Sequence, residues 1–159
     1  MIMKYFKFVL LICMIAQCLS SCSTINQSII RNHKKTDKVF DDMFNSYGNA
    51  FTAGSSYINF SYVWSYSNGK VFLAKLSDGR ITENIEYLGD LDVGEIPKQD
   101  RAFKSCREMD GDYIVYRVNS SSGLKEEELI VNIQCFMNAK KEGFYQKLSN
   151  DIESFGITW

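Results

Sequence analysis

Two periods in the spacing of hydrophobic residues divide the chain into helical and extended segments. Apolar residues recur three and four positions apart over 37–47 and again near the C-terminus, which is the spacing of one helix face. Thr36 precedes the first segment as a candidate N-cap. We therefore expect a helix from Asp37 to about Tyr47, and a C-terminal helix marked by Phe144, Leu148, Ile152 and Phe155.

Between these helices, hydrophobic and polar residues alternate, as they do in half-buried strands. The run 58–66 carries its largest side chains on one face, which we expect helices to cover. Tyr57 and Val63 lie on the opposite face, which is then either a binding surface or the contact for a second layer. Asn68-Gly69 and Asp78-Gly79 predict tight turns, and the further strands are expected at 71–76, 80–88, 113–118 and 127–136.

The segment 89–112 has no clear period. Pro97 suits the first turn of a short helix that would reach about Glu108, and an irregular extended connection is the alternative. The whole pattern predicts an α+β fold: a single antiparallel sheet of about five strands, made of a meander and a hairpin, with N- and C-terminal helices packed on it. We place this single domain at residues 37–159.

The first residues of the chain have the features of an export signal. Lys4 and Lys7 give a basic start, 8–16 is almost entirely apolar, and small residues follow, which is typical of a secretory signal peptide. The apolar run is shorter than the roughly 20 residues that a membrane-spanning helix needs. We therefore expect residues 1–21 to be removed from the mature protein.

Leu19-Ser20-Ser21-Cys22 resembles the lipobox of bacterial lipoproteins. The resemblance implies cleavage before Cys22 and attachment of diacylglycerol to its thiol, usually with a further acyl chain such as palmitate. The protein would then be held to a membrane by lipid, and Ser23 in place of an aspartate favours the outer membrane. The alternative is an ordinary secretory peptide that releases a soluble protein.

Charge is distributed unevenly after the signal. Residues 22–36 are predicted to form the lipidated cysteine and a basic tether, which either lies against anionic headgroups or is simply solvated. Residues 23–38 carry four basic side chains against one acidic side chain, whereas 39–159 carry 12 basic and 18 acidic side chains. The acidic domain argues against a nucleic-acid partner, because nucleic acid requires a basic face.

Two cysteines remain outside the signal and the lipidation site. An exported chain lies in an oxidising compartment, where such a pair normally forms a disulfide. Cys135 ends an apolar strand face, and pairing of the last two predicted strands as a hairpin would bring it near Cys106. We therefore predict a Cys106–Cys135 bridge.

Candidate chemistry is sparse. His33 is the only histidine and falls in the predicted tether, which excludes the histidine-dependent nucleophilic sites and the usual zinc sites. The acidic run of Glu83, Glu86, Asp90, Asp92 and Glu95 has three interpretations: solvated turn residues, a partial calcium loop, or paired carboxylates for glycoside hydrolysis. We expect solvated residues, with no catalytic residue, no metal and no cofactor.

These observations favour a lipid-anchored protein of the bacterial cell envelope. Its expected role is that of a non-enzymatic binding, assembly or inhibitor module for a protein or cell-wall partner. The alternative is a carboxylate-dependent hydrolase that acts on envelope polysaccharide.

Overall fold

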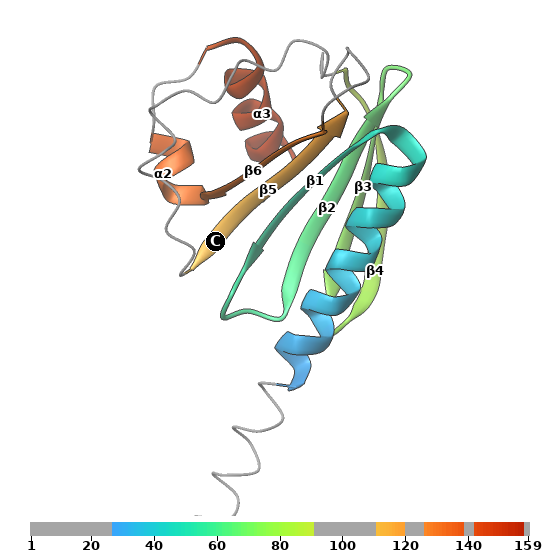
Figure 1. Ribbon diagram of the computed structural model, residues 1–159, viewed down its shortest axis with the longest axis vertical. Helices are drawn as coiled ribbons and strands as arrows, with labels where there is room; N and C mark the ends of the chain where they lie inside the picture. The colour runs from blue at the N-terminus through green and yellow to red at the C-terminus, as the bar shows by residue number, and fades with distance from the viewer. Residues whose placement is uncertain (1–26, 91–110, 120–125, 139–141, 158–159) are drawn as a thin grey trace, which may run out of the picture.

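The computed structural model describes residues 27–90, 111–119, 126–138 and 142–157 (Figure 1). Six strands form one antiparallel sheet in the order β4-β3-β2-β1-β5-β6. The predicted α+β class with a single antiparallel sheet is confirmed, with six strands in place of about five. The strands are β1 (Asn49–Ser55), β2 (Phe60–Ser67), β3 (Lys70–Ser77), β4 (Arg80–Leu88), β5 (Asp112–Asn119) and β6 (Glu126–Asn132).

Strand β1 accounts for the difference in strand number. It lies at the centre of the sheet between β2 and β5, and all seven of its residues are buried. A strand covered on both faces does not alternate between polar and apolar residues. Its sequence, Asn-Ala-Phe-Thr-Ala-Gly-Ser, is also rich in small residues that are weak strand formers. The alternation of polar and apolar residues therefore could not predict strand β1.

The two predicted turns are confirmed. Asn68 and Gly69 join β2 to β3 with φ angles of 53° and 72°, and Asp78 and Gly79 join β3 to β4 with φ angles of 52° and 74°. Positive φ at both central positions is the requirement of the tightest hairpin turn, and Asn-Gly and Asp-Gly satisfy it best.

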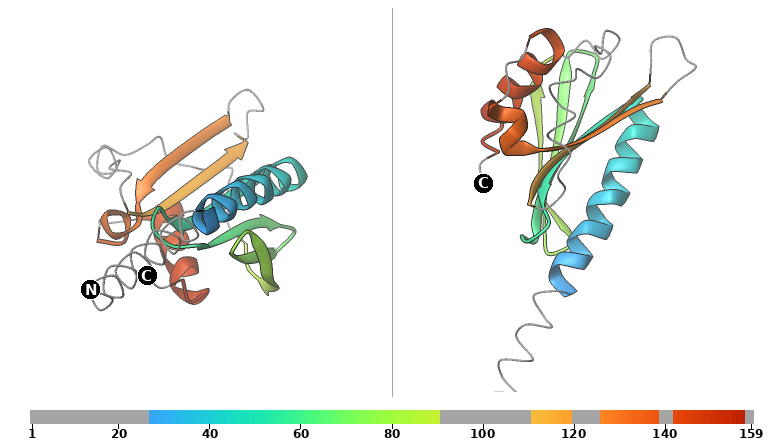
Figure 2. Two further views of the ribbon diagram at one scale, coloured as in Figure 1. Left: turned by 90° about the horizontal axis from the view of Figure 1, so that it is seen from below. Right: turned by 60° about the vertical axis from the view of Figure 1, so that its left-hand side comes forward.

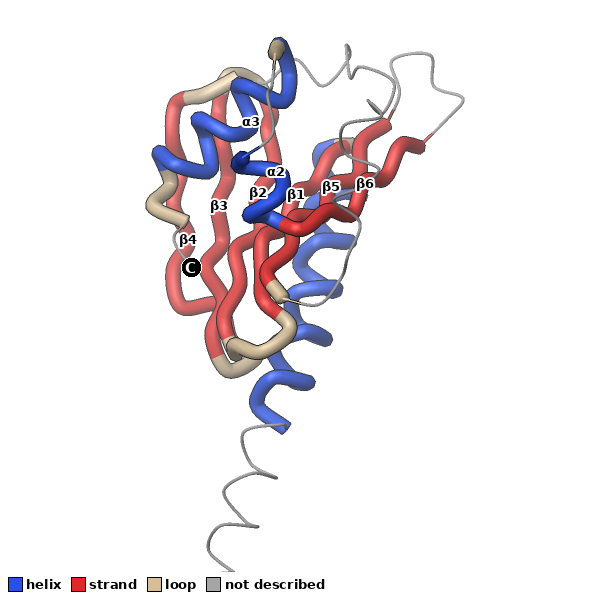
Figure 3. Tube along the Cα trace, turned by 90° about the vertical axis from the view of Figure 1, so that its left-hand side faces the viewer, coloured by secondary structure: helices blue, strands red, loops and turns tan. Residues whose placement is uncertain are grey.

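Helices cover both faces of the sheet. The N-terminal helix, residues 27–47, crosses one face, and α2 (Ile133–Asn138) and α3 (Gly143–Ser154) lie on the other (Figures 2 and 3). The larger core lies under α2 and α3 and includes Phe51 and Trp64, both fully buried. A smaller core joins Val39 and Phe40 of the N-terminal helix to Val63 of β2. Val63 therefore contacts a second layer and does not form a binding surface.

The N-terminal helix differs from its predicted bounds, because it already includes residue 27. Residues 27–36 of the predicted tether are thus helical, and Asn32 and Thr36 within them are buried. The contacts that hold this part of the helix are polar, as described below. Polar contacts leave no helical spacing of apolar residues, so the sequence pattern did not predict this part of the helix.

The strand predicted over 127–136 is also wrong at its end. Strand β6 ends at Asn132, and α2 begins at Ile133. The side-chain Oδ1 of Asn132 accepts the backbone N–H of Cys135 at 3.0 Å, which is the contact of an N-cap with the third helical residue. Cys135 therefore lies on a short helix, where its half-buried side chain packs against the larger core.

Candidate functional site

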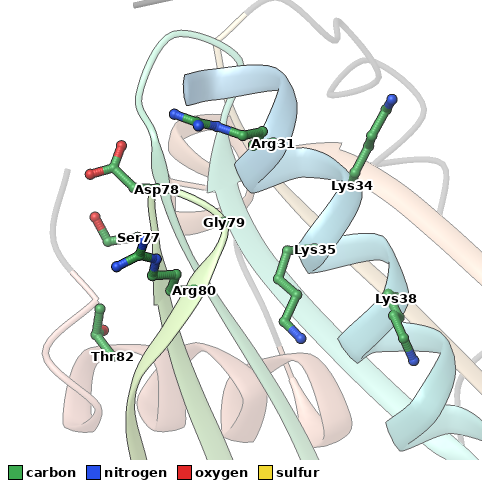
Figure 4. Close-up of a pocket in the computed structure, with 9 residues that line it drawn as sticks. All are labelled: Arg31, Lys34, Lys35, Lys38, Ser77, Asp78, Gly79, Arg80 and Thr82. Carbon is green, nitrogen blue, oxygen red and sulfur yellow. The ribbon is translucent and has the colours of Figure 1, made fainter. Parts of the chain in front are cut away.

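An open groove of about 870 Å³ lies between the N-terminal helix and the β3–β4 turn (Figure 4). Four of its residues come from the helix and five from the hairpin. It is lined by Arg31, Lys34, Lys35, Lys38, Ser77, Asp78, Gly79, Arg80 and Thr82.

The groove is strongly basic, with five cationic side chains and one carboxylate among its lining residues. The four helix residues follow one another at spacings of three, one and three, which places them along one side of a helix. Arg31 extends toward the turn that carries Asp78, whereas Lys34 points away from it (Figure 4). Arg80 lies on the opposite wall. Such an arrangement attracts an anionic group.

A first polar cluster joins the start of the helix to the neighbouring turns. Asp78 Oδ1 accepts hydrogen bonds from the Ser28 hydroxyl and, at 2.6 Å, from Asn59 Nδ2. The same amide nitrogen of Asn59 lies 3.1 Å from Ser28 Oγ. The hydrogen bond from Ser28, followed by that from Asn59, lowers the pKa of the Asp78 carboxyl below its ordinary value. Asp78, the one carboxylate among the described lining residues, is therefore engaged in fixing the turn.

A second polar cluster lies one turn further along the helix and is buried. Thr36 Oγ1 donates to the carbonyl of Asn32 at 2.8 Å and lies 2.6 Å from Ser61 Oγ of β2. Asn32 Nδ2 donates to Ser61 Oγ at 3.3 Å, and Asn32 Oδ1 accepts the backbone N–H of Gly79 at 3.2 Å. Buried polar groups need such partners, and here they position the helix on the sheet.

The helix and the β3–β4 turn also touch through their backbones. A Cβ atom added to Gly79 would lie 3.1 Å from the carbonyl oxygen of Arg31. A side chain at this position would press on the helix backbone and would also be strained by the positive φ of 74°, so glycine suits it on both counts. The wall of the groove is consequently a packed contact between helix and hairpin.

His33 belongs to the domain, contrary to its prediction as a tether residue. Its Nδ1 lies 3.2 Å from the Tyr113 hydroxyl, and the two rings are stacked. Tyr113 itself lies across Gly54 of β1, where a Cβ would come within 2.7 Å of the hydroxyl oxygen. Burial, and secondarily the charge of Asp37, raises the pKa of Tyr113 to about 12. These contacts hold the helix on the sheet.

The predicted acidic candidates do not form one cluster where they are described. Glu83 pairs with Lys75 at 2.9 Å and Glu86 pairs with Lys70 at 2.6 Å, both at the surface. Glu83 lies opposite Lys75 in the register and Glu86 lies opposite Phe72, three positions away along β3. Because side chains alternate between faces, Glu83 and Glu86 lie on opposite faces of the sheet. Asp90 is exposed, and Asp92 and Glu95 lie outside the described residues.

The remaining predicted site residues are only partly described. Cys22 and Cys106 lie outside the described residues, so lipidation and the Cys106–Cys135 bridge stay predictions. Among the residues that are described, no group of three or more histidine, cysteine, aspartate or glutamate side chains is placed to hold a metal ion. No helix within those ranges is long and apolar enough to cross a membrane.

The sequence pattern places Arg31, Lys34 and Lys35 on the predicted tether and Lys38 in the first predicted helix, and it does not connect these residues with Arg80. The available signal was the helical spacing of Arg31, Lys34, Lys35 and Lys38. Their proximity to the β3–β4 turn depends on tertiary packing. Comparison with known proteins adds no further guide, since no family model, curated protein or solved structure matches the chain.

Proposed function

We propose that this protein is a lipid-anchored component of the bacterial cell envelope that acts as a non-enzymatic binding, assembly or inhibitor module for a protein or cell-wall partner. Lipid on Cys22 holds it to a membrane, and Ser23 favours the outer membrane, with the domain facing the periplasm or the cell surface. The resemblance of residues 19–22 to a lipobox supports this anchor.

The start of the folded domain supports a position close to the membrane. Residue 27 is already helical and lies five positions after Cys22. Five residues span at most about 18 Å even when fully extended. A lipid on Cys22 would therefore keep the domain at the bilayer surface, where a bound partner is held as well.

The observation that carries the binding role is the exposed outer strand β4. It lies at the end of the sheet, and β3 is its only strand neighbour in the described part of the chain. Seven of its nine residues are exposed and two are half-buried, with Leu88 at 91 % exposure. An edge strand offers backbone N–H and C=O groups to which an extended segment of a partner protein can add.

The hydrolase alternative receives less support. Two carboxylates that cleave a glycosidic bond face the same substrate, about 5–10 Å apart. Glu83 and Glu86 lie on opposite faces of the sheet, and each is paired with a lysine.

Photo-crosslinking in intact cells tests the binding role. A photoreactive amino acid at Leu88 should form a discrete adduct with one partner, whereas the same amino acid at Glu153, an exposed position on α3, should not. Leu88 and Glu153 variants that give identical adducts, or none, would contradict binding at β4. Digestion of purified peptidoglycan by the wild-type protein would favour the hydrolase instead.

A further inference from the structure

We propose that the basic groove binds phosphate groups of anionic lipid headgroups in the membrane that carries the Cys22 anchor. The start of the N-terminal helix and the β3–β4 turn would then rest on the bilayer. This inference depends on the proposed anchor, and it assigns the anchored domain a fixed orientation.

The charges of the groove support an anionic ligand. Lys38 forms an ion pair with Asp42 at 2.9 Å, but Arg31, Lys34, Lys35 and Arg80 form no ion pair with the residues that the structure describes. Asp78 accepts hydrogen bonds from Ser28 and Asn59, and its charge also interacts with Arg31 and Arg80, so a single carboxylate stands against these cations. The cations of the groove thus outnumber the one carboxylate among its described lining residues, which leaves an excess of positive charge.

The fold holds these cations in fixed positions relative to one another. Had residues 22–36 formed a solvated tether, the basic side chains would have had no fixed relation to Arg80. Instead, the buried contacts of Asn32 and Thr36 with Ser61 fix the helix on the sheet. The close approach of Gly79 to the Arg31 carbonyl fixes the turn against the helix.

The position of the anchor indicates which anion is nearest. Arg31 lies nine residues after Cys22, and the groove begins one helical turn after residue 27. Electrostatic attraction to a charged surface extends over about 8–10 Å at physiological salt, and the short link of at most about 18 Å keeps the helix start near the headgroups. An open groove also fits a flat array of phosphates better than an enclosed pocket would.

Amine labelling of the full-length lipidated protein tests this contact. The protein is reconstituted into phosphatidylcholine vesicles with or without phosphatidylglycerol, and acetylation of each lysine is followed by mass spectrometry. We expect Lys35 and Lys38 to react about fivefold more slowly in the anionic vesicles, given the attraction of one cation to such a surface. Lys70 should react equally in both, because it lies at the other end of β3, about 26 Å from the turn.

Two variants with the same change of charge serve as a matched pair. Arg80→Gln removes a groove cation and should reduce the protection of Lys35, whereas Lys70→Gln should leave that protection unchanged. Equal reactivity of Lys35 and Lys38 in the two kinds of vesicle would overturn the proposal. Protection by inorganic phosphate in neutral vesicles, without an effect of phosphatidylglycerol, would assign the groove to a soluble anion and would overturn it too.

The same samples distinguish absence of the headgroup contact from absence of lipid on Cys22. The mass of the peptide that contains Cys22 reports lipidation independently of the lysine labelling. A lipidated peptide with unprotected lysines refutes the headgroup contact alone. An unmodified Cys22 refutes the anchor, and with it the orientation proposed here.

Discussion

Tyr66 of β2 donates a hydrogen bond to Asp151 of α3 across 85 positions of sequence, with 2.8 Å between the phenol oxygen and Oδ2. The same phenol accepts the indole N–H of Trp64 at 3.2 Å. Burial, followed by the charge of Asp151, raises the pKa of Tyr66 well above its ordinary value. The pair ties the C-terminal helix to the centre of the sheet.

Tyr66→Phe should therefore lower the free energy of unfolding by about 1–3 kcal/mol, because it removes a bond to a carboxylate and leaves the buried Trp64 N–H without an acceptor. Urea denaturation measures the change. Tyr57→Phe is the control, since Tyr57 is 68 % exposed in the β1–β2 loop. An equal effect of the two substitutions would contradict the role assigned to Tyr66.

The raised pKa of Tyr113 leads us to expect that the folded protein loses stability at alkaline pH. Its pKa is about 12 in the folded protein against an ordinary 10.0, so its stabilising contribution is complete below pH 10 and is lost between pH 10 and 12. Between pH 9 and pH 11 the wild-type protein should lose about 1.4 kcal/mol more than Tyr113→Phe, because pH 11 lies one unit above the ordinary pKa and each unit corresponds to about 1.4 kcal/mol. Urea denaturation of both proteins at pH 9 and pH 11 measures this difference in the free energy of unfolding. Parallel losses in the two proteins would show that Tyr113 does not contribute.

Gly79→Ala should be more damaging than Gly69→Ala. Both glycines have nearly the same positive φ, 74° and 72°, but an added Cβ meets the Arg31 carbonyl only at Gly79. We expect a cost of about 1 kcal/mol at Gly69 from backbone strain, and a further 1–2 kcal/mol at Gly79 from displacement of the helix. Thermal unfolding measures both. Equal costs would mean that the helix does not press on the turn.

Cys22→Ala should abolish incorporation of labelled palmitate in cells, because it removes the thiol that accepts the lipid. Cys18→Ala should leave labelling intact, since Gln17 makes Cys18 a poor acceptor in the lipobox pattern. Persistent labelling of Cys22→Ala would refute the lipid anchor.

The predicted Cys106–Cys135 bridge should make the free energy of unfolding sensitive to reduction. Closing a loop of about 30 residues contributes about 3–4 kcal/mol in the chain-entropy model. Alkylation of the envelope-derived protein before and after reduction should show two thiols that react only after reduction. Two thiols that react beforehand would refute the bridge.

Local signals were sufficient for the hairpin turns and for the α+β class. Asn68-Gly69 and Asp78-Gly79 adopt positive φ because these residue types tolerate it, so both turns could be predicted without knowledge of their neighbours in space. The alternation over 58–66 likewise identified the strand whose Trp64 and Tyr66 enter the larger core. These features depend on residues that are close together in the chain.

The tertiary structure decided the rest, because the decisive contacts join residues that are far apart in the chain. Strand β1 shows no alternation, since helices cover it on both sides. The early turns of the N-terminal helix are held by Asn32 and Thr36 through polar bonds to β2. Arg80 meets the cations of the helix only because these bonds align helix and hairpin. The sequence alone determined that basic residues follow Cys22, and packing determined that they form a groove.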